Sequence, residues 1–161
     1  MAKKKVKTNA MRILESEEIE YQDHSYEADK DHVDGVSAAK SIGKHPATVF
    51  KTLVTQGSSK EFFVFVIPVA ETLDMKKAAK ACKEKKVEMI HVKDINKITG
   101  YIRGGCSPIG MKKLYSTYID LSGEKLDSIT VSAGKIGFQI ELKPEDLKKV
   151  AKAEFADLII N

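Results

Sequence analysis

The sequence is poor in cysteine, and its cysteines and histidines show no spacing typical of a metal site. Its two cysteines, Cys82 and Cys106, are too few for a disulfide framework and indicate a reducing compartment. Neither has a second cysteine or a histidine at metal-ligand spacing, and the four histidines form no H-x-x-x-H or H-E-x-x-H pair. The sequence therefore predicts neither a bound metal nor another cofactor.

The chain also lacks a long apolar run. Its longest candidate, "FFVFVIPVA" at residues 62–70, is about half the length of a membrane-spanning helix and contains Pro68. The basic start "MAKKKVK" is followed by polar residues where a signal peptide has its apolar segment. We therefore expect no membrane span and no export, and we predict a cytoplasmic protein.

Repeats, low-complexity stretches and long Pro/Gly/Ser linkers are absent, which predicts a single domain over residues 1–161. With 42% hydrophobic residues, the chain can bury roughly two-thirds of its unfolded surface. Periodicity and boundary residues predict a helix from Thr8, helices at 34–44, 73–85, 92–99 and 144–159, and extended segments at 19–27, 47–55, 61–69, 116–121, 128–134 and 137–144. This order predicts an α+β fold built on a mixed sheet.

Positive charge is clustered rather than abundant. The net charge is only +4, but Lys76, Lys77 and Lys80 belong to a group of six lysines between residues 76 and 86. Such a helix face can attract a polyanion such as nucleic acid, and an ordinary solvated helix face explains the same lysines. Charge alone favours the solvated face.

Lys51 interrupts the segment "VFKTLV", which otherwise has the composition of a buried strand. An unpaired ammonium is costly away from water, so the position predicts an exposed strand face, a paired charge or a functional pocket. Alternation puts Lys51 and Leu53 on one face and Phe50 and Thr52 on the other, and neither face is polar throughout. Two interpretations stay open: Lys51 lines a concave, partly apolar surface, or it extends to solvent from an edge strand.

Two glycine-containing segments are candidates for ligand binding. In "GYIRGGCSPIG", residues 100–110, Gly104 and Gly105 let the backbone approach a ligand and offer N–H groups to an ester carbonyl, a ribose or a phosphate. The segment lacks the spacing of a P-loop or a dinucleotide fingerprint, and a tight structural turn explains it as well. In "VSAGKIG", Ser132 either bonds a substrate or caps the turn, and no G-x-S-x-G elbow surrounds it. For Cys106, a small apolar role is favoured over that of a nucleophile, because the sequence shows no neighbouring base.

A resemblance to a known family covers the chain from about Asn9 to Ile160. It rests on "VFKTLV", "MKKAAKA" with "KKVEMI", "TGYIRGGCSPIGMKK" and "VSAGKIGFQIELKPEDL". In order and spacing these stretches resemble the YbaK/EbsC family of Cys-tRNA(Pro) deacylases, part of the superfamily of prolyl-tRNA synthetase editing domains. The resemblance implies a mixed, β-barrel-like sheet surrounded by helices. It also implies trans-editing, the release of cysteine that prolyl-tRNA synthetase has wrongly attached to proline tRNA.

The resemblance also implies roles for single residues. The active-site lysine of the family corresponds to Lys51, and Gly104 is the implied catalytic main-chain donor. The implied substrate-binding residues are Tyr26, Thr52, Gly105 and Ser132, and the expected tRNA contacts are Lys76, Lys77 and Lys80 on the lysine-rich helix. Val33 and Arg103 stand where some relatives have an aromatic and an apolar residue.

The implied mechanism needs no enzyme nucleophile, because the thiol of the substrate cysteine attacks its own ester carbonyl and forms a cyclic thiolactone. The protein then supplies orientation, main-chain donors for the oxyanion and a cation. The implied partners are aminoacylated proline tRNA and prolyl-tRNA synthetase, with no role for DNA or a membrane. Two alternatives stay open: a deacylase for another small amino acid such as alanine on proline tRNA, and a non-catalytic module that binds tRNA or a synthetase.

Overall fold

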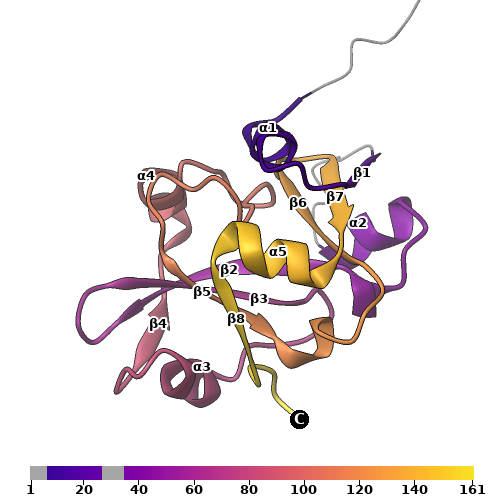
Figure 1. Ribbon diagram of the computed structural model, residues 1–161. Helices are drawn as coiled ribbons and strands as arrows, with labels where there is room; N and C mark the ends of the chain where they lie inside the picture. The colour runs from indigo at the N-terminus through magenta and orange to yellow at the C-terminus, as the bar shows by residue number, and fades with distance from the viewer. Residues whose placement is uncertain (1–6, 27–34) are drawn as a thin grey trace, which may run out of the picture.

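The computed structural model describes residues 7–26 and 35–161, in which helices lie around two β-sheets (Figure 1). The helices are α1 (Asn9–Ser16), α2 (Gly35–Ser41), α3 (Met75–Ala81), α4 (Ile95–Thr99) and α5 (Pro144–Ala151). The strands are β1 (Gln22–Ser25), β2 (Phe50–Gly57), β3 (Phe62–Pro68), β4 (Val87–Met89), β5 (Ser116–Asp120), β6 (Ile129–Lys135), β7 (Phe138–Leu142) and β8 (Ala153–Ala156). Short 3-10 turns are η1 (Pro46–Thr48), η2 (Val92–Asp94) and η3 (Leu121–Gly123). These elements confirm the predicted α+β class.

The strands form one mixed sheet and one antiparallel sheet. The five-stranded sheet has the order β4-β2-β3-β5-β8, with antiparallel pairing of β4, β2 and β3 and parallel pairing of β3, β5 and β8. The three-stranded sheet has the order β1-β7-β6. Between the sheets, an isolated parallel bridge joins Val49 to Thr130. The mixed sheet is confirmed, but the described strands do not close into a barrel, because this bridge does not continue as a ladder.

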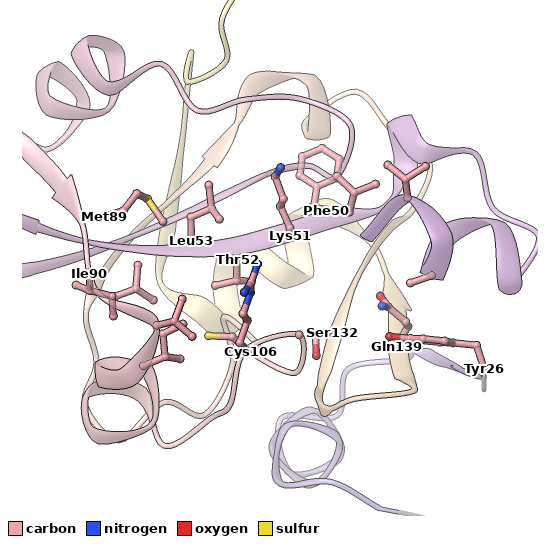
Figure 2. Close-up of a pocket in the computed structure, with 18 residues that line it drawn as sticks. Tyr26, Phe50, Lys51, Thr52, Leu53, Met89, Ile90, Cys106, Ser132 and Gln139 are labelled. Atoms are coloured by element: carbon pink, nitrogen blue, oxygen red, sulfur yellow. The ribbon is translucent and has the colours of Figure 1, made fainter. Parts of the chain in front are cut away.

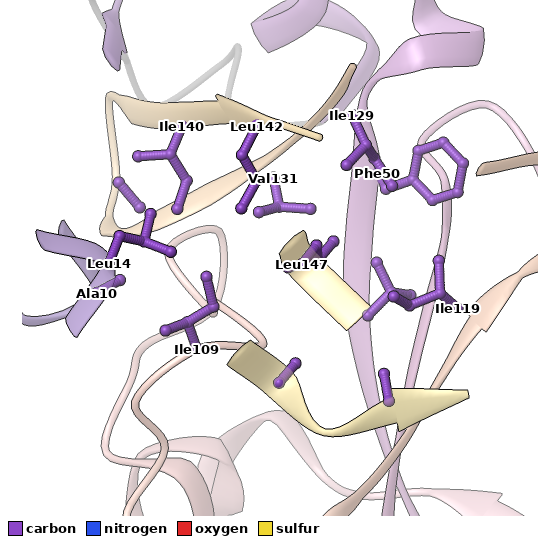
Figure 3. Packing of buried hydrophobic residues seen from close by; sticks show 14 of the residues in the cluster. Ala10, Leu14, Phe50, Ile109, Ile119, Ile129, Val131, Ile140, Leu142 and Leu147 are labelled. Atoms are coloured by element: carbon purple, nitrogen blue, oxygen red, sulfur yellow. The ribbon is translucent and has the colours of Figure 1, made fainter. Parts of the chain in front are cut away.

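The β3 strand lies inside the five-stranded sheet and is apolar on both faces. Val64 and Val66 belong to the core between the sheets, where Leu147 of α5 also packs (Figure 3). Phe65 and Ile67 belong to a second cluster, under α3. A strand covered on both faces has a continuous apolar sequence instead of an alternating one. This arrangement explains the run "FFVFVIP".

The segment after α5 differs from the predicted helix over residues 144–159. The helix ends at Ala151, Lys152 has a left-handed φ of +51°, and Ala153–Ala156 pairs with β5 as strand β8. This pairing provides hydrogen bonds for the main chain and buries Ala153 in the core. The long-range ladder therefore prevails over the local helical pattern.

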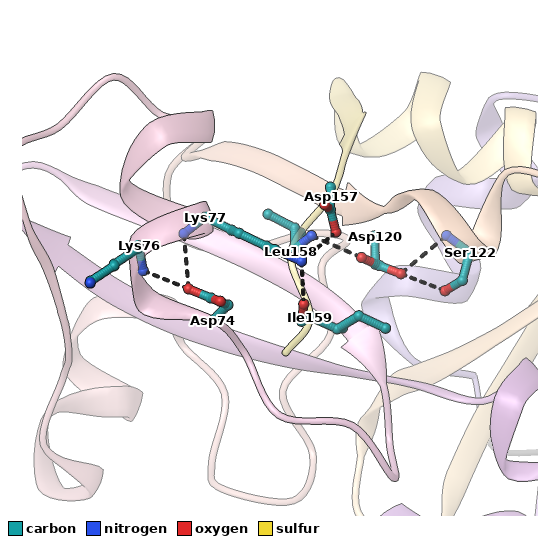
Figure 4. A network of polar contacts seen from close by, with 8 residues as sticks. All are labelled: Asp74, Lys76, Lys77, Asp120, Ser122, Asp157, Leu158 and Ile159. Carbon is teal, nitrogen blue, oxygen red and sulfur yellow. Dashed lines mark hydrogen bonds and ion pairs between the residues drawn. The ribbon is translucent and has the colours of Figure 1, made fainter. Parts of the chain in front are cut away.

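The α3 helix is shorter than the predicted 73–85. Asp74 caps it, because Oδ1 accepts the N–H groups of Lys76 and Lys77 at 2.9 and 3.1 Å (Figure 4). After α3 the chain turns into β4, a short strand that the sequence pattern does not predict. The cap thus moves the start of the helix two residues along the chain from the predicted Leu73.

The predicted ends of two further helices, at residues 34–44 and 92–99, can be compared with the structure. The predicted helix at 92–99 is confirmed as η2 and α4, and Gly100 ends it with a φ of +87°. Gly43, the predicted terminator after α2, has a φ of +73°, a conformation that favours glycine. Asp34, the predicted cap of α2, lies outside the described residues. Among the described helices, none is long and apolar enough to cross a membrane.

Candidate active site

A cavity of about 520 Å³ opens where the two sheets meet (Figure 2). Its walls come from β2, the η2–α4 segment, the glycine-rich loop, the β6–β7 hairpin, the end of β1 and α2. Among the residues that line it are Tyr26, Lys51, Thr52, Gly104 and Ser132. The fold therefore brings to one cavity all the residues expected for catalysis and substrate binding except Gly105.

The cavity lies along an open edge of β2. On this side of the strand, β4 pairs with only the last three residues of β2, and β6 reaches the segment only at the bridge from Val49 to Thr130. Here the carbonyl of Val54 accepts the N–H of Ile90 at 3.2 Å. Main-chain groups alternate in direction along an antiparallel strand, so the N–H and C=O of Thr52 point to the same side, toward the cavity.

Lys51 lies on the face of β2 opposite Thr52, and Figure 2 shows its side chain extending away from Thr52 and Cys106. It is half-buried and makes no ion pair with a carboxylate of residues 7–26 or 35–161. Burial lowers the pKa of Lys51, and the negative charge of Glu71 acts against this shift. The described part of the chain thus offers no paired charge for Lys51, and its side chain lies at one side of the cavity.

The glycine-rich loop contains a tight turn. The N–H of Gly105 donates to the carbonyl of Ile102 at 3.0 Å, and Gly104, the third residue of the turn, has a φ of +85°. A turn with a positive φ at this position favours glycine. The closing hydrogen bond occupies the N–H of Gly105, which does not line the cavity, whereas Gly104 does line it. Gly105 is also tightly packed, because a Cβ there would lie 3.0 Å from the main-chain nitrogen of Ile136.

Tyr101 connects the glycine-rich loop to the β6–β7 hairpin. Its hydroxyl donates to the carbonyl of Ile109, across the base of the loop. Its ring packs against Gly134, where an added Cβ would lie 2.8 Å from the ring. Burial raises the pKa of Tyr101 to about 12, so the hydroxyl stays protonated at neutral pH and remains a donor. These contacts hold Gly104 in a fixed position relative to the hairpin.

The hairpin contributes Ser132 and Gln139, which are register partners and point to the same face. The Oγ of Ser132 accepts the N–H of Gly134 at 3.1 Å, so Ser132 caps the turn and also lines the cavity. Gln139 is only 6% exposed and lines the same cavity. Gln139 was not among the residues expected from the sequence to form the site. The signal was present, because pairing the two predicted strands through their glycine-containing turn sets Gln139 opposite Ser132.

Two buried side-chain oxygens of the cavity, Oγ1 of Thr52 and Oε1 of Gln139, have no hydrogen-bond partner within residues 7–26 and 35–161. Buried polar atoms in folded proteins are nearly always bonded, and an unpaired one costs about 1–3 kcal/mol. Both oxygens accept hydrogen bonds, and the hydroxyl also donates one. The cavity therefore suits a ligand that brings hydrogen-bond donors, such as the ammonium group of an amino acid.

Glu141 holds β1 and the segment after α2 against β7. Its Oε1 accepts hydrogen bonds from Nε2 of His24 and Nζ of Lys44, both at 2.8 Å, and its Oε2 accepts one from Ser128. Burial acts to raise the pKa of Glu141, but the hydrogen bonds from Lys44, Ser128 and His24 outweigh it and lower the pKa to about 2. Tyr26 follows β1 directly, so this carboxylate stabilises the wall of the cavity that carries Tyr26.

Cys106 lines the cavity but lacks the surroundings of a reactive thiolate. Burial raises its pKa to about 11, although a hydrogen bond with Thr99 acts in the other direction. His24 and His45 make hydrogen bonds elsewhere, and His32 lies outside the described residues. The part of the chain that the structure describes holds no group of three ligating side chains suited to a metal ion. These facts agree with the small apolar role expected for Cys106.

The lysines expected to contact tRNA lie on α3, which does not line the cavity. Lys76 and Lys80 are exposed. Lys77 is engaged within the fold, because its Nζ donates to Oδ1 of Asp157 at 3.1 Å and to the carbonyl of Ile159 at 2.8 Å (Figure 4). Two of the three lysines are thus available to a partner.

Comparisons with known proteins identify relatives of this chain. The sequence profile of the family "Aminoacyl-tRNA editing domain" matches residues 31–150. Over 160 residues, and 98% of each chain, the sequence is 48% identical to "Putative Cys-tRNA(Pro)/Cys-tRNA(Cys) deacylase EbsC" of Enterococcus faecalis. A solved structure described as "a putative trans-editing enzyme for prolyl tRNA synthetase" matches with a TM-score of 0.80 at 19% identity, covering 97% of this chain and 100% of that one. The hypothetical protein APE2540 matches with a TM-score of 0.83 at 17% identity, covering 92% and 97%. The two structural likenesses concern the fold.

Proposed function

Since the chain belongs to the aminoacyl-tRNA editing domain family, we propose that it is a deacylase that releases cysteine from mischarged proline tRNA. The name of the relative EbsC, which gives Cys-tRNA(Pro) and Cys-tRNA(Cys), supports this choice of substrate. The observation that carries the proposal is the cavity shared by Lys51, Gly104 and the unpartnered oxygens of Thr52 and Gln139. Its volume of about 520 Å³ lies within the range of small-molecule sites.

The aminoacyl ester lies along the open edge of β2 in this proposal. Its ammonium donates to the buried oxygens of Thr52 and Gln139, which then gain the partners that they lack. The N–H of Gly104 donates to the ester oxygen as negative charge develops on it. Tyr26 and Ser132 form the wall against which the aminoacyl group packs. Lys51 lies on the other face of the strand, toward the ribose-phosphate end, and stabilises the negative charge that develops on the leaving 3′ oxygen of the ribose.

The attacking atom belongs to the substrate. The thiol sulfur of the cysteine forms a bond to its own ester carbonyl carbon, the bond from that carbon to the ribose oxygen breaks, and the thiol proton passes to the leaving oxygen. A cyclic thiolactone and free tRNA result, and water then opens the thiolactone. The raised pKa of Cys106, about 11, supports this route, because it leaves the thiol of the enzyme protonated at neutral pH.

Aminoacylated proline tRNA is the proposed substrate and prolyl-tRNA synthetase the proposed protein partner. The likeness of the fold to a protein described as a trans-editing enzyme for that synthetase supports the partner. The exposed Lys76 and Lys80 of α3 contact the acceptor stem, and Lys77, which pairs with Asp157, contributes less. We expect this activity in the cytoplasm, where tRNA is charged.

Deacylation of cysteinyl-, alanyl- and seryl-tRNA(Pro) by the purified protein tests the proposal. We expect fast release of cysteine alone. Lys51→Ala should lower that rate by on the order of 10²-fold or more, because it removes a cation that acts on the developing charge. Circular dichroism checks that the variant is folded. Lys125→Ala is the matched control, since Lys125 is exposed and outside the cavity.

Other results of these assays would point to a different role for Lys51 or to a different function of the protein. Near-parental turnover by Lys51→Ala contradicts the role of this lysine. Preferential release of alanine indicates a deacylase for another small amino acid, in which water attacks the ester. Binding of tRNA without turnover by the parent protein indicates a non-catalytic module.

A further inference from the structure

One side of the cavity mouth is formed by residues 90–113, which contain η2, α4 and the glycine-rich loop. Val92, Ile95 and Arg103 of this segment line the cavity itself. Six exposed side chains of this segment, two of which line the cavity, define a surface that we call the rim. The rim consists of Val92, Lys93, Lys97, Ile102, Arg103 and Lys112.

The segment that carries the rim is the most basic part of the chain near the cavity. Residues 90–113 hold five basic residues and one carboxylate, Asp94, which gives a net charge of +4, equal to that of the whole chain. Residues 71–90, which include α3, hold six lysines and four carboxylates, which gives +2. Positive charge is therefore concentrated beside the cavity mouth, where it favours the approach of a polyanion.

Three of the four cations of the rim form no ion pair with the described fold, and the fourth, Lys112, bonds a main-chain carbonyl. Lys93, Lys97 and Arg103 are exposed and make no ion pair within residues 7–26 and 35–161. The ammonium of Lys112 donates to the carbonyl of Lys97 at 3.3 Å, and its stem lies over Gly100. By contrast, two lysines of the α3 region pair with carboxylates. Within the described residues, four cations of the rim have no carboxylate partner, whereas α3 itself (Met75–Ala81) has two such lysines, Lys76 and Lys80.

Apolar side chains lie between these cations. Val92 and Ile102 are each 55% exposed, and they directly precede Lys93 and Arg103. Met89, at 47% exposed, also lines the cavity. Single-stranded nucleic acid is bound by cations that contact phosphates together with side chains that pack on unstacked bases, most often aromatic ones. In the rim, the aliphatic Val92 and Ile102 offer that packing. A protein interface is less suited to this combination, because the centre of such interfaces is depleted of lysine.

We propose that the rim binds the unpaired 3′ nucleotides of tRNA, which carry the aminoacyl group into the cavity. The inference rests on the proposed function, because it takes an ester at the 3′ end of tRNA as the ligand of the cavity. Lys93, Lys97 and Lys112 contact phosphates, Val92 and Ile102 contact bases, and the terminal nucleotide enters the cavity between them. The lysines of α3 are then left for the double-stranded stem.

Binding of a fluorescein-labelled single-stranded RNA that ends in CCA, followed by anisotropy, tests the rim without catalysis. Lys93→Glu/Lys97→Glu removes two phosphate contacts, so the slope of log affinity against log salt concentration should fall by about 1.4. Lys76→Glu/Lys80→Glu makes the same change of charge on α3 and should leave this slope at its parental value. Circular dichroism checks that both variants are folded.

Kinetics with two substrates distinguish binding at the rim from the reaction in the cavity. For cysteinyl-tRNA(Pro), the rim variant Lys93→Glu/Lys97→Glu should raise KM by roughly tenfold or more, because two phosphate contacts are lost. For the cysteinyl ester of adenosine, which has no phosphate, the rise in KM should be far smaller. An equal rise for both substrates would mean that the substitutions disturb the cavity, and it would overturn the proposal.

Several other results of the binding measurements would contradict binding of the 3′ nucleotides at the rim. The proposal is wrong if both double variants lose binding of the short strand equally, if the rim variant loses none, or if the parent protein does not bind the strand at low salt. It is also wrong if tRNA without its unpaired 3′ nucleotides binds as tightly as intact tRNA. Binding of the strand through the rim by a parent protein that cleaves no ester would refute the proposed function and leave the rim in place.

Discussion

Glu141→Gln tests whether the buried carboxylate of the three-stranded sheet stabilises the wall of the cavity. The substitution keeps the shape of the side chain and removes the negative charge that Lys44 and His24 contact at 2.8 Å. The side chain of Glu141 is only 11% exposed, so solvent screens these interactions incompletely. We therefore expect a loss of stability larger than that of a surface ion pair.

The size of the expected loss of stability follows from the pKa of Glu141, which is about 2 in the folded protein and has an ordinary value of 4.5. At about 1.4 kcal/mol for each pH unit, this difference corresponds to roughly 3 kcal/mol, and allowance for partial screening lowers it to about 2 kcal/mol. The folded pKa is the lower one, so the stabilisation is fully present above pH 4.5. It is lost as the pH falls from 4.5 to about 2.

Urea unfolding of the parent and of Glu141→Gln, from about pH 7 down to about pH 2, measures this effect. The difference in the free energy of unfolding should be about 2 kcal/mol at neutral pH and should shrink below pH 4.5. Glu88→Gln is the matched control, because Glu88 pairs with Lys86 at 2.9 Å but both side chains are exposed. We expect no measurable change for the control. A difference that does not depend on pH, or equal effects of the two substitutions, would refute the electrostatic reasoning.

Three further substitutions test the cavity by urea unfolding and by turnover with cysteinyl-tRNA(Pro). Gln139→Leu removes a buried oxygen that has no partner within the described residues. The free energy of unfolding should therefore rise by about 1 kcal/mol, while turnover falls. A loss of stability in this variant would contradict the reasoning. Gly105→Ala places a Cβ 3.0 Å from the main-chain nitrogen of Ile136, and we expect a loss of about 1–3 kcal/mol together with reduced turnover; parental stability would mean that the loop yields. Cys106→Ser should keep most of the parental turnover, because the attacking sulfur belongs to the substrate, and loss of turnover in a folded variant would contradict that mechanism.

Local sequence pattern was sufficient to predict the strand that carries Lys51. Alternation correctly separates Lys51 and Leu53 from Phe50 and Thr52, since Leu53 packs with the cluster under α3 and Phe50 with the core between the sheets. The pattern does not tell what covers each face, which is why an edge lysine and a pocket lysine stayed equally open. Only the position of the second sheet places Lys51 at a cavity.

Contacts between distant segments account for what the sequence could not predict. Glu141 meets His24 across 117 residues of chain, and no local pattern connects them. The local pattern of β8 predicts a continuation of the preceding helix, and only the pairing with β5 makes this segment a strand. The register that sets Gln139 beside Ser132 follows from the predicted hairpin, but only the cavity formed by distant segments shows that Gln139 lines a site.

The incomplete closure between the two sheets leaves an open main-chain edge of β2 at Thr52. In a closed barrel the main-chain groups of Thr52 would pair with a neighbouring strand. Here β6 contacts this segment only through the bridge at Val49, and β4 pairs only with residues after Val54. An ester substrate can use such an edge as an added strand would. Adjacent residues of a strand point to opposite faces, so Lys51 and Thr52 offer a cation on one side and an acceptor on the other. A ligand with phosphate at one end and ammonium at the other matches this polarity, and the terminal aminoacyl nucleotide of tRNA has both.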